Sequence, residues 1–335
     1  MADRGLSHSK GHSLSRLSDA CAAAGVEIVC PACNGEIEWS EIALECRVCG
    51  RVYPVVAGMP DLRLAPDRFL SLEDDRAKAV AVLDKAQGRG FGAALDAYWS
   101  LTPELEPNLA RGHLHRQLCE REAGASLWRE VQQRCGTPQS AVLDVGCGLG
   151  GLLAAAAKSG HKAVGLDVAF RWTLIARLLL EEAAVEAVVV CANAEYPPFR
   201  PKTFDLAVAN DLIEHVTDPP TAVAGAARAA SSLYLASTHR FSLAPEPHVR
   251  LFGVGWLPRR MQSSYVKMRR GHAYDRVRPV TAGELSERVT AAGLSPGEVF
   301  AAPVFAGHLG FRARTVLRML ERSPRFAPRI GVIGR

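Results

Sequence analysis

Short apolar runs alternate with longer amphipathic stretches through the second half of the chain. Four or five consecutive apolar residues predict a buried strand, and apolar positions three or four residues apart predict a helix. Strands alternating with helices over about 150 residues are typical of an α/β protein with a doubly wound, mostly parallel sheet. We expect strands at residues 141–145, 163–166, 187–191, 206–209 and 232–236, with late strands at 298–305 and 329–333. We expect helices at residues 151–158, 171–183, 221–230, 281–292 and 311–321.

The first half of the chain has a different pattern. Residues 68–86 and 92–135 follow a loosely helical apolar pattern, which Pro103 and Pro107 interrupt. Before them, short alternating stretches end in a segment with several glycines and prolines, which predicts turns and a boundary. We therefore expect four parts in the chain: a mobile leader (1–24), a compact unit (25–64), a helical linker or cap (65–140) and a sheet domain (141–335).

The composition is that of an ordinary globular protein. Hydrophobic residues make up 48% of the 335 residues and charged residues 22%, so disorder is not expected as the main state. No apolar run is long enough to cross a bilayer, and the first twenty residues lack the apolar region of a secretory signal. We expect a cytoplasmic protein without a transmembrane segment, in which cysteines stay reduced.

Four of the nine cysteines form one cluster in the compact unit. Twelve residues separate Cys30-x-x-Cys33 from Cys46-x-x-Cys49, a spacing that brings four thiolates to the corners of a tetrahedron around Zn²⁺. A redox role would need only one such pair. Because four sulfur ligands leave no open position for a substrate, we expect a structural zinc that stabilises a unit too small to fold on its core alone. With the Tyr-Pro and Gly-Met-Pro stretches that follow, the segment resembles the zinc-ribbon modules related to Trm112, which accompany methyltransferases.

A glycine-rich turn follows the first expected strand of the sheet domain. Gly146-x-Gly148-x-Gly150 lets the backbone approach a ligand, and the helix that follows offers free N–H groups. The third glycine comes one residue earlier than in the dinucleotide-binding fingerprint. Asp144 in the strand suits a cationic ligand better than a pyrophosphate. Asp167 ends the next strand, where a carboxylate can accept hydrogen bonds from both hydroxyls of a ribose.

Two later stretches, 193–199 and 204–211, complete an ordered set of motifs. In this combination the chain closely resembles the class I S-adenosylmethionine (SAM)-dependent methyltransferases over roughly residues 141–300. The resemblance implies a Rossmann-like fold, SAM as cofactor and transfer of a methyl group to an acceptor molecule. Methyl transfer needs little chemical help, because the sulfonium is already a strong electrophile and the enzyme mainly aligns the reactants and excludes water.

The resemblance also implies roles for individual residues in cofactor binding. The glycine turn would surround the methionine part of SAM, with Asp144 near its ammonium group through water, and Asp167 would bind the ribose hydroxyls. Asn193 and Ala194 would face the adenine, where many family members have Asp instead of Asn; an amide oxygen still accepts a hydrogen bond, but a weaker one. Cys147 fills a variable position in the motif. The expected cofactor-binding residues are Asp144, Gly146, Cys147, Gly148, Gly150, Asp167, Val168, Asn193, Ala194 and Asn210.

The segment 210–216 follows the fourth strand and should face the transferred methyl group, because ligands of open α/β sheets bind at the carboxyl ends of the strands. It resembles the Glu-His-Val stretch of methyltransferases of quinone biosynthesis and related small-molecule enzymes. His215 would then be a general base, or Asp211, Glu214 and His215 would bind Mg²⁺ or another divalent ion that orients an acceptor oxygen. In a third interpretation, Glu214 and His215 only begin a helix and hydrogen-bond the SAM loop.

The insert 240–280 is the most individual part of the chain. It carries nine Lys and Arg residues against two acids, with aromatic residues interleaved, and we expect it to form a lid over the acceptor site. Its charge fits a pocket for an anionic small molecule, an RNA-binding face or a membrane-surface patch, and a solvated loop is the plain alternative. Within it we select Arg240 and His248 as substrate-binding residues.

Three functions follow from these features. The leading hypothesis is a SAM-dependent methyltransferase acting on a small, anionic or glycosylated metabolite. The second is an rRNA guanine methyltransferase with an amino-terminal zinc module; the resembling enzymes typically use Cys and His in their second metal pair, where this chain has Cys46 and Cys49. The third is an inactive interaction partner with the methyltransferase fold, and the intact glycine turn and Asp167 argue against it.

Overall fold

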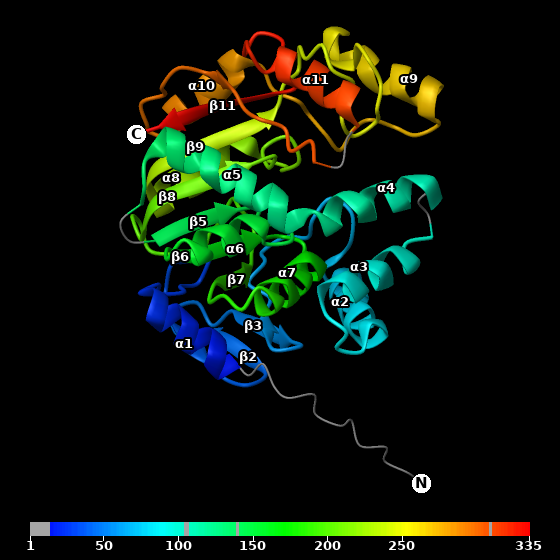
Figure 1. The fold of residues 1–335 in the computed structure, drawn as a ribbon. Helices are drawn as coiled ribbons and strands as arrows, with labels where there is room; N and C mark the ends of the chain where they lie inside the picture. Colours follow the sequence, from blue (N-terminus) through cyan, green and yellow to red (C-terminus); the bar gives the residue numbers. More distant parts are fainter. Residues whose placement is uncertain (1–13, 104–106, 139–140, 308–309) are drawn as a thin grey trace.

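The computed structural model describes residues 14–103, 107–138, 141–307 and 310–335. Its centre is a seven-stranded sheet with strand order β10-β11-β9-β8-β5-β6-β7, flanked by helices (Figure 1). Neighbouring strands from β9 to β7 are parallel, and β11 is antiparallel to both β9 and β10, which confirms the predicted doubly wound, mostly parallel sheet. The strands are β5 (Ala141–Val145), β6 (Lys162–Asp167), β7 (Val188–Cys191), β8 (Phe204–Asn210), β9 (Ala230–Thr238), β10 (Phe300–Ala301) and β11 (Arg329–Gly334).

The order of the strands reverses at β5. This strand pairs with β6 on one side and with β8 on the other, so the chain builds the sheet outward from β5 in both directions. In open α/β sheets, ligands bind outside the carboxyl ends of the strands at such a switch point. The glycine turn leaves the carboxyl end of β5, and the fold therefore places it at the expected ligand-binding edge.

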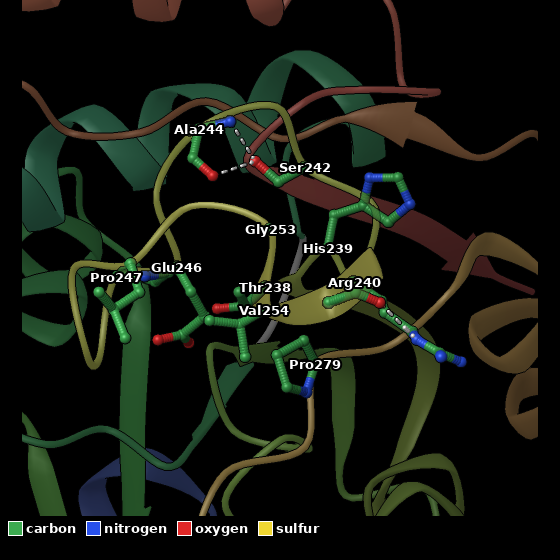
Figure 2. Close-up of a pocket in the computed structure, with 12 residues that line it drawn as sticks. Thr238, His239, Arg240, Ser242, Ala244, Glu246, Pro247, Gly253, Val254 and Pro279 are labelled. Carbon is green, nitrogen blue, oxygen red and sulfur yellow. Dashed lines mark hydrogen bonds between the residues drawn. The ribbon is translucent and has the colours of Figure 1, made fainter. Parts of the chain in front are cut away.

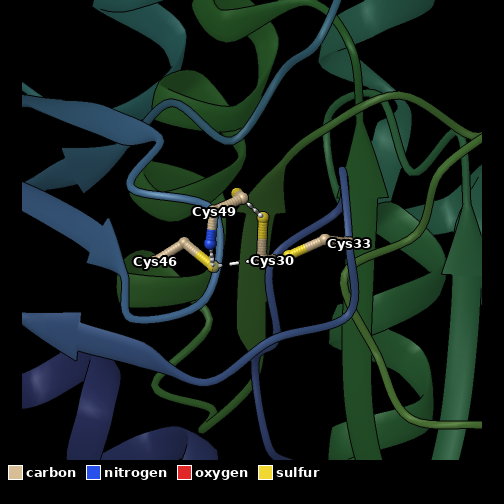
Figure 3. A group of neighbouring side chains, drawn as sticks. All are labelled: Cys30, Cys33, Cys46 and Cys49. Atoms are coloured by element: carbon tan, nitrogen blue, oxygen red, sulfur yellow. Dashed lines mark hydrogen bonds between the residues drawn. The ribbon is translucent and has the colours of Figure 1, made fainter.

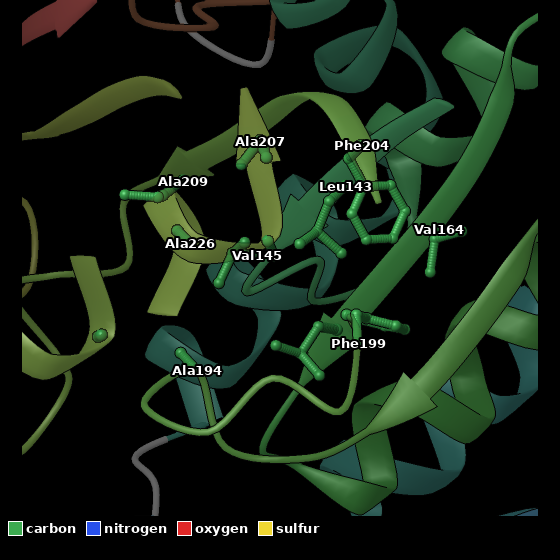
Figure 4. Close-up of a cluster of buried hydrophobic side chains, with 14 of the residues drawn as sticks. Leu143, Val145, Val164, Ala194, Phe199, Phe204, Ala207, Ala209 and Ala226 are labelled. Atoms are coloured by element: carbon green, nitrogen blue, oxygen red, sulfur yellow. The ribbon is translucent and has the colours of Figure 1, made fainter. Parts of the chain in front are cut away.

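Two hydrophobic clusters cover the two faces of the sheet, because side chains alternate along each strand. Leu143 belongs to one cluster, which also contains Phe199 and Phe204 (Figure 4), and its neighbour Val142 belongs to the other. The helices over the first face are α8 (Pro219–Ala229) and α10 (Ala282–Ala291). Those over the second face include α5 (Glu120–Cys135), α6 (Gly151–Lys158) and α7 (Phe170–Glu182).

The helical linker contains more helices than the two stretches expected from the sequence. The expected stretch 92–135 is divided, since the structure has separate helices on either side of the segment that Pro103 and Pro107 interrupt. These helices are α2 (Leu72–Ala86), α3 (Phe91–Ser100), α4 (Pro107–Leu118) and α5. Helix α5 crosses α6 so closely that a Cβ at Gly124 would lie 2.0 Å from the carbonyl carbon of Gly151. This crossing holds the start of α5 against the glycine turn.

The amino-terminal unit is a small antiparallel sheet with the strand order β1-β2-β3-β4, which we call the ribbon. After β4 the chain runs beside β7: Asp61 forms a parallel bridge with Cys191, and the N–H of Leu62 donates to the carbonyl oxygen of Cys191 at 2.9 Å. The ribbon is therefore joined directly to the large sheet. Its strands are β1 (Ile37–Trp39), β2 (Ala43–Cys46), β3 (Val52–Val56) and β4 (Met59–Pro60).

Helix α1 (Leu14–Ala24) precedes the ribbon, and its Cys21 is buried. The expectation of a mobile leader therefore does not hold for this helix, because Leu17, Ala20, Cys21 and Ala24 pack in the same hydrophobic cluster as the ribbon and the sheet. The rest of the expected leader, residues 1–13, lies outside the described residues.

Residues 240–280, which we call the lid, form a small unit at the carboxyl end of β9. It contains the short helix η1 (Val254–Trp256) and helix α9 (Arg259–Arg270). Its own hydrophobic cluster consists of Val249, Leu251, Val254, Val266 and Tyr274. After α10, the expected strand 298–305 is reduced to the short β10, and helix α11 (Phe311–Leu320) follows. In the described parts of the chain, no helix is long and apolar enough to cross a bilayer.

Candidate functional site

The glycine turn joins β5 to α6 in a backbone shape that favours glycine. Gly146, Gly148 and Gly150 have positive φ angles of 80°, 50° and 81°. A Cβ at Gly146 would also lie 2.8 Å from a side-chain carbon of Leu212. Asp167 braces the turn, since its carboxylate accepts a hydrogen bond from the backbone N–H of Gly148 at 2.9 Å. The structure thus brings the predicted turn and the predicted acid together.

Three carboxylates gather around this turn. Asp144 on β5 is buried, and Glu120 at the start of α5 accepts a hydrogen bond from the N–H of Gly151 at 3.2 Å. Burial, together with the negative charges of Glu120 and Asp167, raises the pKa of Asp144 to about 8. Burial also raises the pKa of the other two carboxyls, so the site favours a ligand that brings positive charge. Sequence reasoning misses Glu120, because only the crossing of α5 over α6 brings it here.

Asn193 does not take the role that the resemblance implies. Its amide oxygen accepts hydrogen bonds from the N–H groups of Leu64 at 2.8 Å and Ala65 at 3.2 Å. Its NH₂ group donates to the carbonyl oxygen of Ala65 at 3.1 Å. Because both lone pairs of the oxygen are used, the expectation that it accepts from an adenine amine is wrong. The next residue, Ala194, is buried. Asn193 instead fastens the segment that follows the ribbon to the loop after β7.

Arg63 links that same segment to the loop after β6 through buried ion pairs. Its guanidinium donates to the two carboxylate oxygens of Asp61 at 2.7 Å each, to Asp75 at 2.7 Å and to the carbonyl oxygen of Val168 at 3.0 Å. The side chains of all three charged residues have no exposed surface. Asp75 also accepts a hydrogen bond from the N–H of Phe170 at 2.8 Å, where α7 begins. Since Val168 directly follows the acid of β6, these contacts fix the backbone of the predicted ribose site.

Asn210 and Asp211 end β8 and bind Arg329 of β11. The guanidinium of Arg329 donates to the carboxylate of Asp211 at 2.8 Å and to the amide oxygen of Asn210. Burial raises the pKa of Asp211 despite the positive charge of Arg329. Asp211 has a φ of 52°, a left-handed conformation that is uncommon outside glycine and often found near functional sites.

Glu214 is directed into the protein. It is completely buried, and its carboxylate accepts hydrogen bonds from the Ser237 hydroxyl at 2.9 Å, the Thr238 N–H at 3.1 Å and the Thr238 hydroxyl at 3.0 Å. Within the described residues, the four-cysteine cluster is the only group of three or more His, Cys, Asp or Glu side chains close enough to share a metal ion. The structure therefore does not bring Asp211, Glu214 and His215 together as ligands of one divalent ion, and Glu214 stabilises the end of β9.

His215 and His248 come together although they are 33 residues apart in the chain: their Nε2 atoms lie 3.2 Å apart. Glu246 lies behind this pair, with Oε1 2.5 Å from Nδ1 of His248 and Oε2 accepting from the N–H groups of His248 and Val249. Burial lowers the pKa of His215. Burial also lowers the pKa of His248. The hydrogen bond to Glu246 and the negative charge of Glu246 outweigh this effect of burial, so the pKa of His248 is raised.

The hydrogen bonds of this cluster define where its protons lie. Because Nδ1 of His248 donates to Glu246, Nε2 of a neutral His248 carries a lone pair, and a single proton fits between the two Nε2 atoms. The sequence selects His215 as a catalytic residue and His248 as a substrate contact, whereas the structure places both in one cluster. Sequence reasoning misses Glu246, although it precedes His248 by only two residues.

Arg240 binds the backbone of the lid. Its guanidinium donates to the carbonyl oxygens of Gly255 at 3.0 Å and Leu257 at 3.3 Å, and it lies 4.9 Å from the ring centre of Phe241. Figure 2 shows Arg240 and Glu246 among the residues that line a small pocket between the end of β9 and the lid. Arg240, predicted to contact substrate, therefore holds the lid in place.

The four cysteines of the ribbon converge on one point (Figure 3). The Sγ atoms of Cys30 and Cys49 lie 3.7 Å apart, those of Cys33 and Cys46 lie 3.4 Å apart, and all four lie within 4.8 Å of one another. A tetrahedral zinc with bonds of about 2.3 Å to sulfur would set the sulfurs about 3.8 Å apart. The donor set and its spacing therefore fit Zn²⁺.

A shell of hydrogen bonds surrounds the sulfurs. The N–H groups of Val48 and Cys49 lie 3.4 Å and 3.5 Å from the sulfur of Cys46, and the hydroxyl of Tyr53 lies 3.0 Å from that of Cys30. Such partners orient the first ligands of a metal site. Tyr53 lies on β3, which pairs with β4, and β4 leads directly into Asp61 and Arg63. The cysteine cluster is thus connected to the loop after β6 through β3, β4 and the buried side chain of Arg63.

Comparison with known proteins agrees with this geometry. Residues 143–232 match the family model described as a methyltransferase domain. A ubiquinone biosynthesis O-methyltransferase from Thiobacillus denitrificans is 31% identical over 147 residues, which cover 44% of this chain and 58% of that protein. The chain thus spans little more than half the length of this relative.

Matches among solved structures were also found. One is a SAM-dependent methyltransferase from Mesorhizobium loti, 16% identical, with a TM-score of 0.45 and coverage of 64% of this chain and 99% of that chain. Another is a chain of the complex between the Haloferax volcanii Trm112 methyltransferase activator and a methyltransferase, also 16% identical, with a TM-score of 0.45 and coverage of 66% and 92%.

The matched segment contains the glycine turn, Asp167 and His215. The order of strands in the surrounding sheet reverses at β5, and the sheet ends in the antiparallel strands β11 and β10. Residues 143–232 therefore match a methyltransferase domain, and in this structure they lie within a doubly wound, mostly parallel sheet.

Proposed function

We propose that the protein is a SAM-dependent methyltransferase that acts on a hydroxyl oxygen of a small, anionic or glycosylated acceptor. The observation that supports it most is the glycine turn with its three carboxylates, of which Asp144 is buried, at the switch point of the sheet. The O-methyltransferase relative supports oxygen as the acceptor atom, and the basic lid supports an acceptor with negative or polar groups.

The acids of the glycine turn would bind the cofactor. Asp144 and Glu120 favour the ammonium group of SAM, and Asp167 is placed to accept hydrogen bonds from the ribose hydroxyls. Bound SAM supplies a methyl group on a positively charged sulfur. The segment at Leu64 and Ala65 and the loop at Val168 keep the backbone around the ribose fixed, and this reduces the entropy that cofactor binding costs.

The histidine cluster would accept the proton of the acceptor. The hydroxyl must lose its proton as its oxygen bonds to the methyl carbon and the bond from that carbon to sulfur breaks. In the neutral pair of His215 and His248, one proton lies between the two Nε2 atoms, so the hydroxyl proton would go to Nδ1 of His215 while the shared proton moves to Nε2 of His248. Glu246 stabilises the resulting positive charge on His248, as its contact at 2.5 Å allows.

A labelled-methyl experiment tests this function. The protein is incubated with SAM labelled on the methyl group and with separate pools of polar metabolites, lipids and RNA. The expected product is a labelled small molecule with a methyl ether, and His248→Ala should abolish its formation. His272→Ala is the matched control, because His272 is exposed on the lid and lies outside the cluster. Transfer to carbon or nitrogen, or full activity of His248→Ala, would contradict the proposal.

We also propose that the ribbon holds one structural Zn²⁺ through Cys30, Cys33, Cys46 and Cys49. Four sulfur ligands close the coordination sphere, so the ion would stabilise the ribbon and take no part in methyl transfer. The measured metal content of the purified protein tests this assignment.

A second candidate, an rRNA guanine methyltransferase, is supported by charge. Residues 240–335 contain seventeen Lys and Arg against six acids. Labelled RNA in the experiment above, with RNA affinity that falls steeply with salt, would favour it. If calorimetry shows no binding of SAM or S-adenosylhomocysteine, the protein is an inactive interaction partner and both enzyme functions fail.

A further inference from the structure

Positive charge is concentrated at one end of the chain. Residues 240–335 carry seventeen Lys and Arg against six acids, whereas residues 1–239 carry 23 against 29. The basic part builds the lid, α10, α11 and β11, which lie together at one end of the molecule (Figure 1). The ribbon lies at the opposite end. The protein is therefore electrically asymmetric, although its formal net charge is only +5.

Helix α11 presents apolar side chains to solvent between arginines. None of its described side chains is buried, and Phe311, Val316 and Met319 are 76%, 55% and 62% exposed. Phe311 and Met319 are eight residues apart and lie along one stripe of the helix. Arg314 and Arg318 flank this stripe, and they make no ion pair with any described residue. Exposed apolar side chains on a helix that buries none of its described residues mark a surface for interaction.

Helix α9 of the lid repeats this arrangement. It buries only Gln262 and Val266, while Met261 and Met268 are 50% and 75% exposed. These two methionines are seven residues apart and share one face of the helix. Arg260, Lys267 and Arg269 of α9 are exposed and form no ion pair with any residue that the structure describes. Two helices at the same end of the molecule thus combine protruding apolar side chains with basic residues that form no ion pair with described residues.

The lid and the segment after α11 are packed together. The N–H of Leu243 donates to the carbonyl oxygen of Phe326 at 3.2 Å, and the rings of Trp256 and Phe326 are stacked with centroids 6.4 Å apart. Leu243, Phe252 and Trp256 are themselves 50%, 65% and 49% exposed. The lid loop therefore adds apolar side chains to the same end of the molecule as the two helices.

We propose that this face, formed by α9, α11 and the lid loop 243–256, binds the surface of an anionic phospholipid bilayer. Interfacial helices place Phe, Met and Val among the acyl chains and Lys and Arg at the phosphate level. RNA binding would use the arginines and aromatic rings, but it gives no role to protruding Met261, Met268 and Met319. A membrane uses both the charge and the aliphatic surface.

The proposed membrane-binding face lies next to the proposed acceptor site, because the lid contributes residues to both. His248 and Glu246 belong to the lid, and Phe252 on the membrane-binding loop is four residues beyond His248. Binding would therefore place the histidine cluster near the bilayer surface, where amphipathic acceptors collect. This consequence depends on the proposed methyltransferase function, whereas binding to the bilayer does not, so separate measurements distinguish the two.

Vesicle co-sedimentation of the full-length protein tests the proposal. We expect binding to vesicles that contain phosphatidylglycerol, and binding at least about tenfold weaker to neutral phosphatidylcholine vesicles or in high salt. Arg314→Glu/Arg318→Glu should weaken binding to the anionic vesicles about tenfold or more. Lys85→Glu/Arg129→Glu, two exposed sites outside the face, is the matched control and should bind as the wild type does.

A second pair of variants tests the apolar contribution. Phe311→Ser/Met319→Ser should weaken vesicle binding several-fold even at low salt, and Ile42→Ser/Val52→Ser, at exposed apolar sites of the ribbon, should not. Because α11 buries no side chain, its variants should melt as the wild type does. Equal binding to neutral and anionic vesicles, or no loss in either α11 variant, would overturn the proposal. So would RNA binding that depends on Arg314 and Arg318 in a protein that does not sediment with vesicles.

Discussion

His215 and His248 face each other through their Nε2 atoms at 3.2 Å, one from the loop after β8 and the other from the lid. This contact joins the methyltransferase fold to its most individual segment. Because Glu246 raises the pKa of His248 while burial lowers that of His215, the two imidazoles differ in proton affinity. The pair is therefore suited to exchange one proton with a ligand.

The first prediction concerns the pH dependence of methyl transfer. The pair must be neutral to accept a proton, so the rate should rise with pH as the pair loses its extra proton. Glu246→Gln removes the charge that raises the pKa of His248, and the rise should therefore move to lower pH, with kcat reduced about tenfold or more. Rate profiles from pH 5 to 9 measure the shift. A lower rate with an unchanged profile would mean that Glu246 has only a structural role.

Asp144→Asn should have opposite effects on stability and on cofactor binding. Burial holds the pKa of Asp144 in the folded protein at about 8, above its usual 3.8, so the unfolded chain loses this proton first and stability falls as pH rises between those values. At pH 8 the variant without cofactor should therefore melt several degrees higher than the wild type, and the difference should vanish near pH 4. Its affinity for S-adenosylhomocysteine should fall. Thermal melts and calorimetry measure the two effects.

Asp167→Ala should weaken SAM binding by about a hundredfold, because two charge-assisted hydrogen bonds to the ribose are lost. It should also lower stability modestly, since the carboxylate accepts hydrogen bonds from the N–H groups of Gly148 and Ala169. Calorimetry with S-adenosylhomocysteine measures the affinity, and circular dichroism confirms folding. Wild-type affinity in a folded variant would refute the assignment of Asp167 to the ribose.

Arg63→Met should destabilise the protein by about 3–5 kcal/mol, because it removes the buried guanidinium that Asp61 and Asp75 share and leaves each of these buried carboxylates with one other arginine. Arg76→Met is the matched control: Arg76 also binds Asp61, but its side chain is 25% exposed, and its loss should cost far less. Chemical denaturation measures both. In conditions where the Arg63 variant stays folded, its affinity for S-adenosylhomocysteine should be lower, because Val168 loses its hydrogen bond.

Cys46→Ser should remove the metal from the ribbon and loosen the cofactor site. We expect one zinc per chain in the wild type and in Cys119→Ser, a control outside the cluster, and none in Cys46→Ser when metal content is measured by mass spectrometry. The path from β3 and β4 to Arg63 predicts that a folded, zinc-free protein binds S-adenosylhomocysteine more weakly. Retention of one zinc per chain in Cys46→Ser would reject the proposed site.

Local features were predictable from the sequence where neighbouring residues determine them. The apolar run before Gly146 predicts a strand, and the apolar run before Asp167 predicts that this acid ends the next strand. The structure brings the glycine turn and Asp167 together. The antiparallel pairing of β11 and the shortness of β10 depend instead on how the end of the chain packs on β9. Contacts between segments far apart in the chain place three further residues at the site, and the neighbouring sequence does not predict them. These residues are Glu120, Arg63 and Glu246.

The errors have the same physical origin. The resemblance assigned Asn193 to the adenine, but it carried no information on the segment after the ribbon, whose N–H groups at Leu64 and Ala65 use the amide oxygen. Glu214 looked like a metal ligand in the sequence, and the hydroxyls of β9 bind it instead. In each case a partner distant in the chain determined the role of the side chain.

The pairing of Asp61 with Cys191 has a consequence for how the molecule avoids self-association. β7 is the last strand of the large sheet, and an open outer strand offers unpaired backbone groups to other molecules. The chain after β4 covers part of this strand with its own hydrogen bonds. A truncated protein that begins after residue 65 would uncover it, and we expect such a fragment to form intermolecular β-aggregates instead of an isolated catalytic domain.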